Sequence, residues 1–223
     1  MSEWWTYSLS DFLMFSSRSY YRLLELYNAA VWPAHWLALA AGVIVMAGVA
    51  RPDRHMRVAA ALALAATWGW VAWAYHLERY ADINTAAPYF AAAFALQALL
   101  LCLMAARPVT AVSGRMQQRL ALGIVGLAVI AYPALALLRD GGWAQAEVFG
   151  IAPDPTVVAT LGVLLGWRAH PIAWIVPVAW CAVSGATLMA LRIGSAALLP
   201  VCAVLAVTAG LVSRYARQRQ ASV

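Results

Sequence analysis

Residues 147–156 read EVFGIAPDPT, and this stretch decides how the fold is interpreted because it runs directly into the apolar segment Val157–Trp167. The apolar segment holds about 11 residues, which rise only about 1.5 Å each in a helix and so cannot cross a hydrocarbon core of about 30 Å. Pro153 and Pro155 lack an N–H group and disfavour helix at the residue before them. We therefore predict a membrane crossing that is broken between Gly150 and Pro155. A broken helix at membrane depth needs protein or a water-filled cavity to satisfy its backbone, which makes this stretch the expected polar site.

The composition of the whole chain indicates a membrane protein. Of the 223 residues, 65% are hydrophobic and 11% are charged, whereas soluble domains carry about 25% charged residues. We predict an all-α, polytopic transmembrane helical bundle with seven helices, the fifth of them broken. Its parts are an interfacial amphipathic segment at 1–28, a seven-helix transmembrane domain at 29–213 and a basic cytoplasmic tail at 214–223. The apolar segments lie at about 29–50, 58–75, 87–106, 120–138, 148–167, 171–191 and 196–213.

The first 28 residues are aromatic and amphipathic rather than uniformly apolar. Phe12, Tyr20 and Tyr27 fall at roughly helical spacing, with Arg18 and Arg22 between them. Trp and Tyr are common at the headgroup level of membranes, so we expect an interfacial helix here. Two interpretations stay open, because this helix suits either a plain membrane anchor or a lid over the outer ends of the bundle.

The arginines predict the orientation of the bundle. Seven crossings place ten of the 15 arginines on one side together with a single acid, Asp53, and place the other eight acids on the opposite side. Since loops rich in Lys and Arg stay in the cytoplasm, we expect the N-terminus outside and the C-terminus inside. The ten arginines are Arg51, Arg54, Arg57, Arg107, Arg115, Arg119, Arg168, Arg214, Arg217 and Arg219.

Polar residues expected on the outer side are candidates for binding a solute. The segment 154–156 fits a helix start, with Asp154 as the N-cap and proline at the first helical position. The alternative is that the free N–H groups of this helix line a solute site. Asp82 and Asp154 lie at the edges of apolar helices and need cationic partners, for which Arg79 and Arg139 are available. The predicted substrate-binding residues are Asp154, Asp82, Asn84, Glu78, Glu147 and Thr156.

Two histidines are candidates for a metal or a cofactor. His76 and Glu78 are potential metal ligands, and the alternative use of this pair is an interfacial hydrogen-bond network. His35 and His76 both lie toward the outer side, so bis-histidine ligation of haem b is the one cofactor arrangement that stays open, and no cofactor is predicted otherwise. Each histidine also suits hydrogen bonding between membrane helices. Cysteines fall in apolar segments and are expected as core residues: Cys102, Cys181 and Cys202.

Missing motifs narrow the function. The chain has no lysine, which rules out a retinal Schiff base, and it has no phosphate-binding Gly-rich loop and no Ser–His–Asp or HExxH arrangement. A non-enzymatic role is therefore favoured, while enzyme activity stays open. The net charge of +6 comes from arginines in short loops and does not indicate nucleic-acid binding.

Three functional hypotheses follow from these residues. The first is a small-solute or ion transporter or channel with an acidic outward-facing site. The second is a non-catalytic subunit or assembly partner of a larger membrane complex, and the third is a haem-binding membrane oxidoreductase. The expected partners are membrane lipids and either further copies in a homo-oligomer or a larger membrane complex.

Three stretches carry a resemblance to a known family: WTYSLSDFLMF…YYRLLELYNAAVWP at 5–33, YHLERYADINTAAPYFAAAFALQALLL at 75–101 and VFGIAPDPT at 148–156. The whole chain resembles a family of small bacterial multi-pass membrane proteins that is classified only as a domain of unknown function. The resemblance implies a bacterial inner membrane and implies no activity. With the orientation that the arginines predict, the N-terminus is expected in the periplasm and the C-terminus in the cytoplasm. The residue between the two prolines is often Cys in that family, so Asp154 puts a thiol-based role in doubt here.

Overall fold

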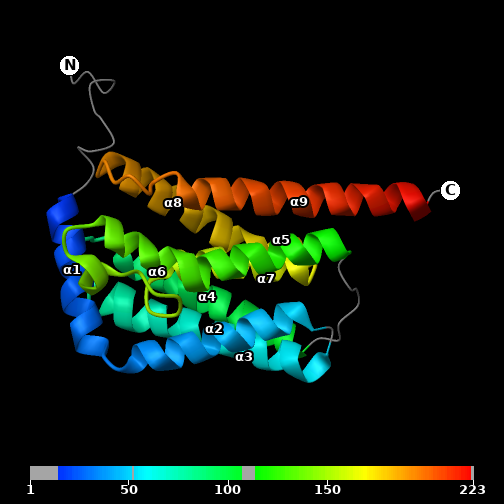
Figure 1. The fold of residues 1–223 in the computed structure, drawn as a ribbon, viewed down its shortest axis with the longest axis horizontal. Helices are drawn as coiled ribbons and strands as arrows, with labels where there is room; N and C mark the ends of the chain where they lie inside the picture. The colour runs from blue at the N-terminus through cyan, green and yellow to red at the C-terminus, as the bar shows by residue number, and fades with distance from the viewer. Residues whose placement is uncertain (1–14, 52, 107–113, 222–223) are drawn as a thin grey trace, which may run out of the picture.

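A computed structural model describes residues 15–51, 53–106 and 114–221 of the chain. The regular elements of the described residues are helices, as the sequence predicts (Figure 1). The α-helices are α1 (Ser17–Val31), α2 (Ala34–Ala50), α3 (Arg54–Trp70), α4 (Ala87–Ala106), α5 (Arg115–Gly126), α6 (Tyr132–Ala134), α7 (Pro153–Gly166), α8 (Ile175–Ala190) and α9 (Leu198–Ala221). The π-helices η3 (Val71–Leu77) and η5 (Leu127–Ala131) continue α3 and α5, and the short 3-10 segments are η4 (Tyr80–Asp82), η6 (Leu135–Leu138), η7 (Gly142–Gln145) and η8 (Pro171–Trp174).

Several of these helices are long and apolar enough to cross a membrane. Five qualify on their own within the described residues, and α1 with α2 passes only as a pair that is bent by 93°. Adding α2 and the shorter apolar helix α7 makes the structure compatible with the seven crossings that the sequence predicts. The five are Arg54–Asp82, Ala87–Ala106, Arg115–Leu138, Pro171–Ala190 and Leu198–Ala216.

Helix α1 lies across one end of the bundle (Figure 1). Its N-cap is Ser16, whose side chain accepts a hydrogen bond from the Ser19 N–H at 3.2 Å and so satisfies one of the free donors of the first turn. The apolar face of the helix packs into the core, while Arg18 and Arg22 are exposed on the other face. This amphipathic pattern explains why α1 covers the bundle rather than running through it. The buried side chains of α1 are Tyr20, Leu23, Leu24 and Tyr27.

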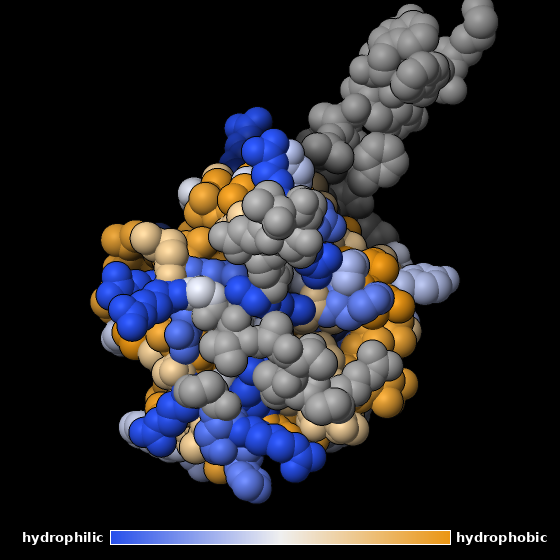
Figure 2. Space-filling model, turned by 90° about the vertical axis from the view of Figure 1, so that its right-hand side faces the viewer, coloured by the Kyte–Doolittle hydropathy of each residue, from blue (hydrophilic) through white to orange (hydrophobic). Residues whose placement is uncertain are grey.

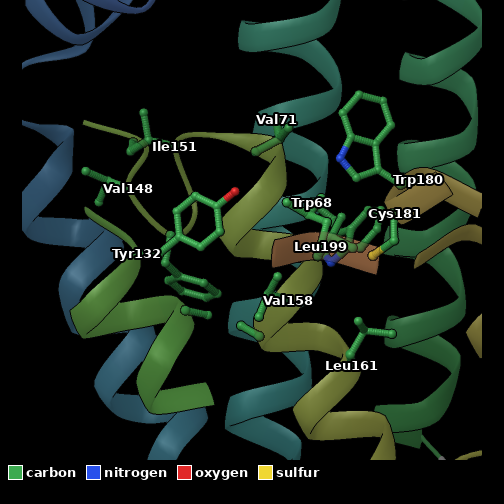
Figure 3. Close-up of a cluster of buried hydrophobic side chains, with 14 of the residues drawn as sticks. Trp68, Val71, Tyr132, Val148, Ile151, Val158, Leu161, Trp180, Cys181 and Leu199 are labelled. Carbon is green, nitrogen blue, oxygen red and sulfur yellow. The ribbon is translucent and has the colours of Figure 1, made fainter. Parts of the chain in front are cut away.

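Helix α7 forms the centre of the bundle. It packs against α2, α3, α5, α8 and α9, and every residue from 145 to 166 is buried. A helix that is apolar all round has no face for solvent and belongs inside a bundle. Figure 3 shows Val158 and Leu161 of α7 among Trp68, Cys181 and Leu199 from the surrounding helices. With 14 residues, α7 is only about 21 Å long, so the break that the sequence predicts before Pro155 is confirmed.

The two ends of the bundle differ in charge. The α2–α3 connection, the start of α5, the end of α7 and the C-terminal part of α9 lie at the end opposite α1 (Figure 1). Figure 2 looks onto that end, where hydrophilic residues gather between apolar flanks. Helix α9 runs unbroken to Ala221, so the basic segment that begins at residue 214 extends the last helix. Arginines at this end include Arg51, Arg54, Arg57, Arg115, Arg168 and Arg214.

Candidate functional site

Side chains from other elements hold the irregular chain that precedes α7. The Asn28 amide donates to the carbonyls of Ala144 and Ala146, at 2.9 Å each. The Tyr27 hydroxyl donates to the Ile151 carbonyl at 3.2 Å, and Arg139 donates to the Gln145 carbonyl at 2.9 Å. Buried backbone groups need such partners once they leave a helix. Helix α1 is thus bonded to the irregular stretch that it covers.

The turn into α7 is built from Gly150 and Thr156. Gly150 has a φ of +77°, a conformation that glycine adopts most readily, and a Cβ there would lie 2.9 Å from Thr67 Cγ2. The Thr156 hydroxyl accepts from the Gly150 N–H at 2.8 Å and donates to the Ala152 carbonyl at 2.7 Å. Thr156 therefore secures the turn, and its hydroxyl is directed to the backbone.

Asp154 does not cap α7, so that interpretation of the sequence is wrong. The helix begins at Pro153, and the N-cap is Ala152, which makes no side-chain cap bond. Proline occupies the first helical position, where a missing N–H costs nothing. The shift by two residues places Asp154 in the first turn, near the positive end of the helix dipole, and leaves its carboxylate free to bond other helices.

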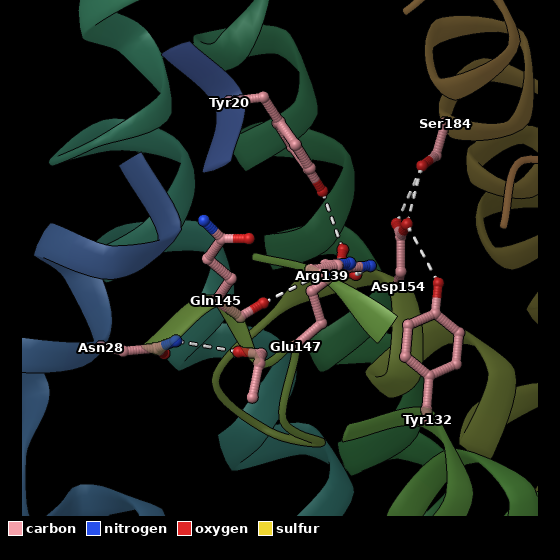
Figure 4. Close-up of polar contacts among 9 residues, drawn as sticks. Tyr20, Asn28, Tyr132, Arg139, Gln145, Glu147, Asp154 and Ser184 are labelled. Carbon is pink, nitrogen blue, oxygen red and sulfur yellow. Dashed lines mark hydrogen bonds and ion pairs between the residues drawn. The ribbon is translucent and has the colours of Figure 1, made fainter. Parts of the chain in front are cut away.

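The Asp154 carboxylate is almost completely buried, with 1% of the residue exposed. Trp180 Nε1 donates to Oδ1 at 2.8 Å, and Ser184 Oγ lies 2.9 Å from Oδ1 and 3.0 Å from Oδ2. The Tyr132 hydroxyl makes a longer contact of 3.4 Å to Oδ2 (Figure 4). The ion pairs among the described residues do not include Asp154, so the expected pairing with Arg79 or Arg139 is not found. Neutral donors and a helix N-terminus surround this carboxyl group instead.

The cation at this end pairs with Glu147. Arg139 Nη2 lies 2.8 Å from Glu147 Oε2, and the Tyr20 hydroxyl donates to Oε1 at 2.8 Å. Burial acts to lower the pKa of the Arg139 guanidinium, but the Glu147 carboxylate outweighs it and raises that pKa overall. Glu147 therefore has a cationic partner, whereas Asp154 has none among the described ion pairs.

A chain of polar contacts leads from the surface to this pair. Exposed Arg22 contacts Glu25 at 2.8 Å, and Glu25 Oε1 accepts from Gln145 Nε2 at 2.8 Å. A surface hollow of about 860 Å³ is lined by Arg22, Glu25, Arg139 and Gln145. Arg139 of this hollow pairs with buried Glu147, which accepts from Tyr20, so polar groups extend from the α1 end of the bundle to within the core.

A small cavity lies on the inner side of Tyr20, against Asp154. Its volume is about 10 Å³, which is room for roughly one water molecule. Five aromatic side chains contribute to its wall, together with the polar side chains of Asp154, Ser184 and Thr187. The lining residues that matter here are Tyr20, Tyr75, Tyr80, Phe90, Trp180 and Ser184.

His76 lies in the same aromatic cluster, and its residue is fully buried. Neither ring nitrogen has a hydrogen-bond partner, which is rare for a buried polar group. Five aromatic rings pack around it with centroids 4.6–6.0 Å away. They belong to Tyr75, Tyr80, Phe90, Phe94 and Trp180.

The proposed metal and haem pairs are not brought together. Glu78 is exposed, whereas His76 is buried without a partner. His35 Nε2 lies 3.3 Å from Asn28 Oδ1, and His35 lines a separate groove near Trp36. The described residues contain no group of three or more His, Cys, Asp or Glu that is arranged to hold a metal.

The predicted substrate-binding residues divide into two groups. Asp154, Glu147 and Thr156 come together in the buried stretch, as the sequence suggests. Glu78 and Asp82 are exposed, and Asn84 Oδ1 accepts from the Ala86 N–H at 2.9 Å, which caps the next helix. The sequence interpretation missed the residues that bond or face the two acids. These are Tyr20, Tyr132, Trp180 and Ser184.

Comparisons with known proteins identify a family for this chain, and that family is one of unknown function. The model of a family of unknown function, DUF6064, matches residues 17–222. No curated protein and no solved structure matches the chain.

Proposed function

This chain belongs to DUF6064, a family of unknown function. From its own residues we propose that it is an integral membrane carrier of a small monovalent cation. The observation that carries the proposal is Asp154, a buried carboxylate that no cation neutralises among the described residues. An ionisable group inside a membrane helix bundle is costly and marks an ion or substrate path by default. A bound cation would supply the charge that the protein does not.

The polar groups beside Asp154 support access from the α1 end. Arg139 lines the surface hollow and pairs with Glu147, and Glu147 accepts from Tyr20, which lines the cavity at Asp154. Toward the other end, α7 continues with buried apolar residues from Val157 to Val163 and beyond, interrupted by Thr160, whose hydroxyl bonds the Thr156 carbonyl and the Trp68 indole. We infer a state that is accessible from one side and closed to the other, as an alternating-access carrier requires.

The proposed setting is the bacterial inner membrane, with α1 at the periplasmic face. The arginine-rich end of the bundle then faces the cytoplasm, in agreement with the positive-inside rule. In this orientation the Glu147–Tyr20 route opens to the periplasm. The carrier would therefore take up its cation from outside the cell.

Current measurements on proteoliposomes test the proposal. Purified full-length protein is adsorbed on a solid-supported membrane and exposed to jumps of pH, ammonium chloride, KCl or NaCl at constant ionic strength. At least one cation should give transient currents with the wild-type protein, and Asp154→Asn should remove them. Glu78→Gln makes the same chemical change at an exposed acid of the same end and should leave the currents intact.

Two results would contradict this function. One is an absence of current from the wild-type protein with every cation, and the other is an unchanged current from Asp154→Asn. A stoichiometric partner that remains bound in mild detergent, combined with absent currents, would favour the subunit hypothesis instead.

A further inference from the structure

The cavity at Asp154 has the chemistry of a cation site with aromatic walls. Tyr20, Tyr75, Tyr80, Phe90 and Trp180 all contribute to its lining. The faces of aromatic rings attract cations electrostatically, most strongly when the site is desolvated. The carboxylate gives the site a negative charge, and the rings around it give the site an apolar boundary.

The carboxylate has room for one more donor. A carboxylate offers about four acceptor positions on its two oxygens. Three groups donate to it: Trp180 to Oδ1, Tyr132 to Oδ2 at a long 3.4 Å, and Ser184, whose single hydroxyl proton is shared between the two oxygens. One of the four positions is therefore left. Asp154 itself lines the cavity, so a species inside it can donate to the remaining position.

Size and ligand type narrow the choice of cation. The volume of about 10 Å³ accepts one species of about the size of water, which excludes choline and other quaternary ammonium ions. Bare metal cations such as Ca²⁺ and Mg²⁺ need shells of six or more oxygens, and this wall is mostly carbon. An ammonium ion needs fewer oxygen partners, because its N–H groups donate to a carboxylate and also to aromatic faces.

We propose that the aromatic cavity at Asp154 is a binding site for the ammonium ion, with Asp154 as its counter-charge and Phe90, Tyr80 and Trp180 as its aromatic wall. The inference rests on the proposed carrier function and names its substrate class. Tyr20 separates this cavity from the surface hollow through its bond to Glu147. The ion would pass Tyr20 on its way to Asp154.

Thermal unfolding of the detergent-purified full-length protein tests the site. Ammonium chloride should raise Tm above the values in NaCl and KCl at equal ionic strength, because a ligand that binds only the folded state stabilises it. Methylammonium chloride, whose cation exceeds the cavity, should give a smaller rise. Asp154→Asn should abolish the rise caused by ammonium.

Two phenylalanines of α4 provide a test in which Asp154 is left unchanged. Phe90 lines the cavity, whereas Phe94 packs on His76 and Trp180 one turn further along and is not part of the lining. Phe90→Leu should weaken ammonium binding by about two- to thirtyfold, the range of one cation–π contact. Phe94→Leu should leave the affinity unchanged. This comparison remains decisive if Asp154→Asn fails to fold.

The results of these experiments distinguish a failure of the ammonium site from a failure of the proposed carrier function. An ammonium effect equal to that of KCl, or equal losses of affinity in Phe90→Leu and Phe94→Leu, would overturn the ammonium site. Asp154-dependent currents driven by pH jumps alone, with no effect of ammonium on Tm, would overturn it and leave the carrier function standing. An absence of currents with every cation removes the carrier function itself.

Discussion

Asp154 is held inside the bundle by donors that come from two separate parts of the chain. Tyr132 is provided by α6, while Trp180 and Ser184 are provided by α8. Hydrogen bonds to charged groups contribute about 1.5–3 kcal/mol each, which exceeds the contribution of neutral pairs. The site therefore stabilises the packing of α8 on α7 as well as preparing a binding position.

Ser184→Ala should destabilise the protein by about 1.5–3 kcal/mol, because it removes the only hydroxyl that reaches both oxygens of the carboxylate in the described contacts. Unfolding in detergent with increasing SDS measures the change. Thr187→Val, on the same helix, is the matched control, since the Thr187 hydroxyl bonds only the Val183 carbonyl. Equal stability of the Ser184 variant and wild type would contradict the assigned role of this serine.

The position of Asp154 in the first turn of α7 also changes how the effect of Asp154→Asn is interpreted. An asparagine caps helices well, so the substitution would isolate the charge if Asp154 were the N-cap. The carboxylate instead accepts from Trp180 and Ser184, and an amide presents its NH2 group to one of these donors. Part of the effect of Asp154→Asn is therefore a lost hydrogen bond, and the phenylalanine pair on α4 gives the cleaner comparison.

The Arg139–Glu147 pair should behave as a coupled unit. Its side chains are 11% and 3% exposed, so Arg139→Gln leaves a buried carboxylate without its cation and should cost about 3–5 kcal/mol. The double variant Arg139→Gln with Glu147→Gln should be more stable than the single Arg139 variant. A double-mutant cycle in SDS unfolding gives the coupling energy, and additive effects would show that the pair is not coupled.

At the scale of elements, α5 and α7 approach each other through a glycine. A Cβ on Gly162 would lie 2.8 Å from the Ala121 carbonyl oxygen and 2.8 Å from Val125 Cγ2, whereas a Cβ on Gly123 meets open space. Backbone atoms cannot give way as a flexible side chain can. Small residues at helix contacts are the usual means of bringing membrane helices together.

Two alanine substitutions should therefore act in opposite directions. Gly162→Ala forces α7 away from α5 and should destabilise by about 1–3 kcal/mol. Gly123→Ala meets no neighbour and should stabilise by up to about 1 kcal/mol, because alanine favours helix over glycine. Unfolding of both variants in the same detergent provides the comparison. A stabilising effect at Gly162 would mean that the two helices are not in close contact.

The break before α7 could be predicted from the sequence, whereas the partners of Asp154 could not. Two prolines and a glycine act on the local backbone, so their effect depends on neighbouring residues alone. Trp180 and Ser184 lie 26 and 30 residues beyond Asp154, and their contacts depend on how α8 packs on α7. A local signal does exist for Ser184, which is a lone hydroxyl in the apolar run 175–186. The sequence also singles out His76, but the aromatic surroundings of this residue depend on packing from α4 and α8.

At the scale of the whole molecule, the arginines of the described residues lie toward the two ends of the bundle. The orientation of those ends in a membrane remains a prediction from the positive-inside rule. A cytoplasm-active reporter fused after Val223 should be active, and a periplasm-active reporter inserted after Asp140, an exposed residue at the α1 end, should be active as well. The reverse pair of activities would invert the topology and the direction of access to Asp154.

The π-helices η3 and η5 imply two places where this chain carries one residue more than a regular helix would use. A π-turn accommodates an inserted residue, and removing that residue rotates the later part of the helix by about 100°. His76 lies within Val71–Leu77, and Tyr132 directly follows Leu127–Ala131. Relatives that lack these side chains at the site should therefore differ by single-residue gaps at one or both positions. The fully packed segment Pro153–Gly166 leaves no such freedom, and its length should be the same throughout the family.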